Sequence, residues 1–133
     1  MLAGSPIRLR SYARRVARIA LLSPDLLFGS KVEGALAVAG HEVNRFATAE
    51  RLRVAAQFHD LVIFDLTAEE IDGPDLLHTL REHGEIGDVP TLGYYSHVDA
   101  EMRARALDAG FTRVVPRSRM ARETVAVVEG LLQ

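Results

Sequence analysis

The sequence predicts a single α/β domain in which five parallel strands alternate with helices in a (βα)5 order. Short apolar runs recur along the chain, and patterns typical of capped helices fill the intervals between them. No internal repeat or low-complexity linker divides the 133 residues, of which 48% are apolar and 26% charged, so one hydrophobic core is expected. The alternation implies a doubly wound parallel sheet with helices on both faces and right-handed crossovers.

The expected strands are short and mostly apolar, as in a sheet that is buried on both faces. They are RIALL at 18–22, HEVNRF at 41–46, LVIFDL at 61–66, PTLGYY at 90–95 and RVV at 113–115. The third begins with four apolar residues, and a carboxylate, Asp65, follows them near its end.

Capping residues mark the expected helices. Ser23 and Pro24 indicate the N-cap and the first residue of a helix that ends at Gly40. Thr48 is expected to cap a helix that runs to about Gln57. The other helices are expected from Asp72 to Gly84, from Asp99 to Gly110 and from Ala121 to Leu132.

Residues 1–17 differ in charge from the rest of the chain, although the net charge of the whole is only −2. The arginines within or next to this segment are Arg8, Arg10, Arg14, Arg15 and Arg18. No acidic residue lies among them, so 1–17 is predicted to be a basic arm or an extra helix that precedes a domain at 18–133. The remainder is acidic, which argues against general nucleic-acid binding.

Composition and motifs exclude several classes of protein. Without cysteine there is no disulfide framework and no thiolate metal site. No apolar run approaches a membrane span of ~20 residues or the core of a signal peptide, so we expect a cytoplasmic protein. The chain also lacks a phosphate-binding glycine motif, a nucleophile elbow and a paired-histidine zinc motif, and no enzyme is predicted.

Functional groups in such a sheet gather at the carboxyl ends of the strands, near the point where the strand order reverses. The candidate site residues at that edge are Ser23, Pro24, Asp25, Asp65, Thr67, Tyr95, Ser96 and Arg117. Asp65 is the central candidate. A purely structural role is also open for it, because aspartate at a strand end often accepts a bond from a nearby backbone N–H.

Two stretches, DLVIFDLTAEEIDGPDLL and VPTLGYYSHVDAEMRARALDAGFTRVVPRSR, make the chain resemble the receiver domain of response regulators, the CheY-like family of two-component signalling. Asp65 stands at the family's phospho-acceptor position. Asp72-Gly73 follow at the spacing of the family's DG, and ALDAG at 106–110 is similar to its ALEAGA segment. The resemblance covers 18–132 and implies a flavodoxin-like fold.

The departures from the family pattern lie around Asp65. The acidic pair that helps to bind Mg²⁺ aligns with Ser23 and Pro24, which supply no carboxylate. The family's Thr or Ser aligns with Tyr95, and its Lys-Pro with Arg117-Ser118. The resemblance therefore implies a degenerate receiver, or pseudo-receiver, that docks to partners without Mg²⁺-dependent phosphorylation. The guanidinium of Arg117 is expected to hold Asp65 or the oxygens beside it.

Three functions remain open at this point. The first is a pseudo-receiver that regulates an unknown signalling protein by docking, with neither metal nor cofactor. The second is a response regulator in which Asp65 is phosphorylated and Glu69 and Glu70 help to hold Mg²⁺. The third is a flavodoxin-like binder of a small flat ligand at the rim from Tyr95 to His97.

A homodimer is a further expectation, through the face made by the fourth helix, the fifth strand and the last helix. The last helix carries more apolar positions than one core stripe needs. These positions are Val125, Val127, Val128, Leu131 and Leu132.

Overall fold

The computed structural model describes residues 16–133. The basic arm or extra helix expected at 1–17 therefore falls almost entirely outside the described residues. Of that segment, Val16 is exposed and Ala17 is buried at the start of the sheet. The boundary between arm and domain stays a prediction.

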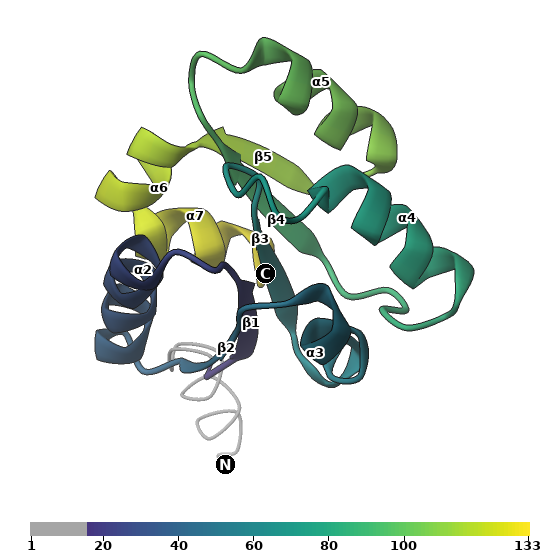
Figure 1. Ribbon diagram of the computed structural model, residues 1–133. Coiled ribbons are helices and arrows are strands. Elements are labelled where there is room, and N and C mark those ends of the chain that lie inside the picture. The colour runs from purple at the N-terminus through teal and green to yellow at the C-terminus, as the bar shows by residue number, and fades with distance from the viewer. Residues whose placement is uncertain (1–15) are drawn as a thin grey trace.

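Five parallel strands form one sheet in the order β2-β1-β3-β4-β5 (Figure 1). They are β1 (Arg18–Leu22), β2 (Glu42–Phe46), β3 (Leu61–Asp65), β4 (Thr91–Tyr95) and β5 (Arg113–Pro116). All five expected strands are present, and the doubly wound α/β prediction is confirmed. The strand order reverses between β1 and β3, so the carboxyl ends of these two strands flank the switch point.

Helices cover both faces of the sheet, as Figure 1 shows. One face carries α2 (Leu26–Val38), α6 (Arg117–Arg122) and α7 (Thr124–Leu131). The other face carries α3 (Ala49–Arg53), the 3-10 turn η1 (Ala56–Phe58), α4 (Gly73–Glu82) and α5 (Ala100–Ala109). Successive strand residues point to opposite faces. In β1, Leu21 therefore enters the α2 side and Leu22 the α4 side, and two apolar cores result.

Two of the expected helices begin and end as their capping residues indicate. The carboxylates of Asp72 and Asp99 accept hydrogen bonds from the backbone N–H groups of Asp75 and Met102, each at 3.0 Å. After α5, Gly110 adopts φ 94°, a left-handed conformation that favours glycine.

The start of α2 differs from the prediction. Its N-cap is Asp25, whose side chain accepts from the N–H of Phe28, and not Ser23. Ser23 is turned inward to Asp65 instead, at 2.7 Å between Oγ and Oδ2. The local pattern predicts that this serine caps the helix. In the structure it makes a tertiary hydrogen bond to a buried carboxylate instead.

The helix expected from Thr48 is shorter than its pattern indicates. Thr48 caps it, but α3 ends at Arg53, and tighter turns in which Ala55 donates to Leu52 and Phe58 donates to Ala55 follow it. Both Leu52 and Ala56 are fully buried by this path. Burial of these two residues therefore outweighs the propensity for a continuous helix.

The closing helix is divided at Glu123, whose φ of −128° is not helical. The buried hydroxyl of Thr124 donates to the carbonyl oxygen of Met120 at 2.5 Å. Such a bond competes with helical backbone pairing. The single helix expected from Ala121 is thus replaced by α6 and α7.

Most of the apolar surplus expected on the closing helix is buried. Val127, Val128 and Leu132 are buried. Val125 and Leu131 are partly buried and pack against the same core. The core therefore accounts for most of this apolar surface, and the homodimer through this face stays a prediction. Among residues 16–133, no helix combines the length and apolar character needed to cross a bilayer.

Candidate functional site

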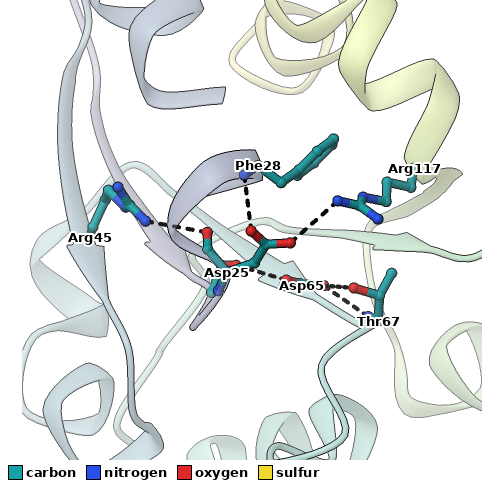
Figure 2. A network of polar contacts seen from close by, with 7 residues as sticks. Asp25, Phe28, Arg45, Asp65, Thr67 and Arg117 are labelled. Atoms are coloured by element: carbon teal, nitrogen blue, oxygen red, sulfur yellow. Dashed lines mark hydrogen bonds and ion pairs between the residues drawn. The ribbon is translucent and has the colours of Figure 1, made fainter. Parts of the chain in front are cut away.

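Asp65 ends β3 with a side chain that is almost wholly buried, since the residue is 3% exposed. Its Oδ2 accepts from the Ser23 hydroxyl at 2.7 Å. Its Oδ1 accepts from the backbone N–H of Thr67 at 2.8 Å and from the Thr67 hydroxyl at 2.5 Å (Figure 2). A buried carboxylate is costly unless hydrogen bonds compensate it, and here neutral donors engage both oxygens.

Ser23 reaches Asp65 because β1 and β3 are neighbours and both end at this edge. Its backbone N–H donates to the carbonyl of Phe46 at 2.9 Å, which fixes the turn after β1. Its hydroxyl donates to Asp65 and also accepts from the N–H of Asp25 at 3.1 Å. The serine therefore connects β3 with the beginning of α2.

Arg117 contacts Asp25, two residues beyond Ser23. Its Nη2 lies 3.3 Å from Oδ2 of Asp25, and its guanidinium stacks 4.3 Å above the ring of Phe28 (Figure 2). Arg117 was expected to hold Asp65 or the oxygens beside it. The structure has the second arrangement, because the ion pair forms with the neighbouring carboxylate of Asp25 and not with Asp65. The reason lies in access, because the Asp65 oxygens are buried and already bonded whereas the Asp25 side chain is 39% exposed.

Arg45 approaches the same turn from β2. Its guanidinium donates to Ser30 Oγ at 3.1 Å. It also donates to the backbone carbonyl of Asp25 at 3.4 Å (Figure 2). It passes directly over Gly29, where a Cβ atom would lie 2.4 Å from Nη2. The absence of a side chain at Gly29 is thus what admits the arginine.

Tyr94 is the site residue that the sequence interpretation missed. It pairs with Asp65 in the register of β3 and β4, and its ring packs 5.0 Å from that of Phe28. Its hydroxyl is fully buried near Ser23 and Asp65, and no partner lies at hydrogen-bond geometry within 16–133. Burial, and next the negative charge of Asp65, raises the pKa of Tyr94 well above its usual range. Only the strand register, which the sequence does not display, could have identified it.

Tyr95 is 8% exposed and packs in the other core, beneath α4 and α5. The two adjacent tyrosine rings are therefore buried on opposite faces of the sheet. Ser96 is half-buried and His97 is exposed beyond them. Neither ring offers a free face to a flat ligand at the rim.

A shallow hollow of about 360 Å³ opens beside Asp65. Its lining residues are Pro24, Asp25, Asp65, Thr67, Ala68, Glu69 and Glu70. Glu69 and Glu70 are exposed. In the part of the chain that the structure describes, no three acidic, histidine or cysteine side chains are grouped to hold one metal ion.

The order of the five parallel strands matches the flavodoxin-like fold of solved CheY-like structures. Solved structures of receiver domains match this chain over most of its length. No protein-family model matches the sequence, and no curated protein does so either.

Three of these structures illustrate the likeness. NtrX from Brucella abortus is 20% identical with a TM-score of 0.76; the match covers 89% of this chain but only 27% of NtrX. CheY4 of Vibrio cholerae is 18% identical with a TM-score of 0.76 and matches over 89% of this chain and 100% of its own. The receiver domain of the TMAO respiratory system response regulator TorR is 23% identical with a TM-score of 0.75, over 86% and 95%. At these identities the likeness concerns the fold.

Proposed function

We propose that this protein is a receiver-like signalling module that acts by docking to another protein, without Mg²⁺-dependent phosphorylation of Asp65. The observation that carries the proposal is the engagement of Asp65, whose two oxygens accept bonds from Ser23 and Thr67. Such a carboxylate is held in one place by its neighbours. The residue then serves to fix the turns at this edge, where a partner would contact the protein.

The charges around Asp65 support the same proposal. Phosphoryl transfer depends on positioning and on cations that neutralise the developing charge. Ser23 and Pro24 add no carboxylate for a metal ion, and Arg117 is engaged by Asp25. A phosphoryl group on Asp65 would therefore meet no prepared positive charge among residues 16–133.

Acetyl phosphate with Mg²⁺, followed by intact-mass measurement, tests the proposal. We expect no added phosphoryl group and no change in melting temperature with Mg²⁺. A native-state ligand at ~100 times its Kd would add ~2.7 kcal/mol, which a thermal scan detects easily. The matched control is Ser23→Asp with Pro24→Asp, which restores two carboxylates and should gain Mg²⁺-dependent stability.

A second candidate is a phosphorylatable response regulator that uses Asp65 as acceptor. The acidic hollow beside Asp65 favours it, because Glu69 and Glu70 are within the same lining and could approach a metal ion. In that case the wild-type protein gains one phosphoryl mass, and Asp65→Asn does not. This result would replace the docking proposal.

The docking partner is proposed to be a signalling protein of unidentified kind. A homodimer through α5, β5 and α7 is the other arrangement expected from the sequence. The exposed large apolar residue of α5 is Leu107, which is 45% accessible. Leu107→Asp is therefore the variant that tests self-association there.

A further inference from the structure

The outer side of α3 and η1 exposes apolar residues that the fold does not use. Leu52 and Ala56 face the core and are fully buried. Val54 is 75% exposed and Phe58 is 62% exposed on the same segment. A helix on a sheet needs one apolar stripe for the core, and these two side chains lie outside that stripe.

The surface beside Val54 is hollowed rather than flat. A depression of about 390 Å³ is lined by Phe46, Glu50, Arg51, Val54 and Ala55. Three of its five lining residues are apolar. Its remaining two, Glu50 and Arg51, are adjacent in the chain and carry opposite charges.

Neither of these side chains forms an ion pair within residues 16–133, although Glu50 lies near enough for its charge to help raise the pKa of Arg53. Arg53, on the same helix, forms its ion pair with Glu85 at 2.8 Å. Glu50 and Arg51 are both exposed and have no ion pair in the described part of the chain. One acid and one base are thus available together at an apolar hollow.

We propose that this surface binds the same surface of a second copy across a two-fold axis. In a two-fold contact, each patch meets itself, so each Glu50 can approach the Arg51 of the other copy. Val54 and Phe46 then bury apolar area between the two ion pairs. A second copy carries the required complementary charges by construction, whereas any other partner would have to supply them separately.

Sedimentation velocity of the full chain over a range of concentrations tests the pairing. We expect reversible dimers whose Kd rises by about tenfold or more in Val54→Asp, which buries a charge in the contact. The control is Val38→Asp, since Val38 on α2 is 91% exposed and lies elsewhere; it should leave the Kd unchanged. A strict monomer at all concentrations would overturn the proposal.

Charge reversal tests the two-fold arrangement itself. Glu50→Arg and Arg51→Glu should each weaken the dimer, and the two together should restore it because the reciprocal pairs are re-formed with opposite sign. Single reversals without effect would contradict the arrangement. A dimer that survives Val54→Asp but is lost in Leu107→Asp would place the contact on α5 and overturn the proposal. None of these variants alters Asp65, so failure here leaves the phosphorylation test independent.

Discussion

Asp25 and Asp65 lie at the same edge of the sheet, yet they use their carboxylates in opposite ways. Asp65 is buried and accepts only from neutral donors, Ser23 and Thr67. Asp25 is partly exposed, caps α2 and pairs with Arg117. The contrast shows that the exposed carboxylate of Asp25 forms the ion pair at this edge, while neutral hydroxyl and N–H donors bind the buried carboxylate of Asp65. Hydrogen bonds and an ion pair thus hold both carboxylates in fixed positions at this edge.

Asp65→Ala should cause the largest loss of stability among the substitutions at this edge. The Ser23 hydroxyl and the Thr67 N–H would lose their acceptor inside the protein, at an expected cost of about 3 kcal/mol in the free energy of unfolding. Asp65→Asn keeps one oxygen for Thr67 and should cost only about 1 kcal/mol. Urea denaturation measures both. Equal losses would mean that the negative charge, and not the set of hydrogen bonds, matters at this position.

Ser23→Ala should cost less, about 2 kcal/mol, because it removes one bond to a charged acceptor. It also removes the acceptor for the N–H of Asp25, so the start of α2 should lose protection from hydrogen exchange. Ser23→Thr retains the hydroxyl and is the matched control. A loss below that of an ordinary surface substitution would show that Asp65 is stabilised without the serine.

Substitutions of Asp25 test the role of the exposed carboxylate in this comparison. Asp25→Ala removes the cap of α2 and should cost about 1 kcal/mol. Asp25→Asn keeps a capping oxygen and loses only the exposed ion pair with Arg117, which should cost about 0.5 kcal/mol or less and should fade in salt. Thermal unfolding at low and high salt separates the two. A salt-insensitive loss in Asp25→Asn would argue against this division.

Tyr94→Phe should have the smallest effect near neutral pH, or a slight gain of stability, because the deleted hydroxyl has no hydrogen bond. At alkaline pH the free energies of unfolding of the wild-type protein and of Tyr94→Phe should diverge. The pKa of Tyr94 is raised in the folded state, so its contribution is present below the unfolded value near ~10 and is lost as pH rises above it. The free energy of unfolding of Tyr94→Phe should therefore decrease less steeply with pH above pH ~10 than that of the wild-type protein. Parallel pH profiles would contradict the raised pKa.

Local patterns predicted the fold better than they predicted the site. The strands, and the caps at Asp72 and Asp99, follow from residues that are close in sequence, and the structure has them as expected. Asp65 was also placed at the right edge. The role of Ser23 was misjudged because its bond to Asp65 joins segments far apart in the chain. For Arg117 the sequence left two acceptors open, and only the structure shows that Asp25 is the one used.

Tyr94 shows why such contacts escape a sequence interpretation. Its neighbourhood depends on the register between β3 and β4, and a shift of one residue would exchange it with Tyr95. Two adjacent tyrosines therefore look equivalent in the sequence. In the structure one lies beside Asp65 and the other lies in the opposite core.

The bare backbone at Gly29 has a consequence for how this sequence can change over time. Arg45 rests where any side chain at position 29 would have to be, so alanine there must displace the guanidinium from Ser30 and from the turn at Asp25. Conversely, once position 45 holds a short residue, the constraint on position 29 is lifted, and a better helix former becomes tolerable. The two positions should therefore covary among homologues, with glycine at 29 accompanying arginine at 45.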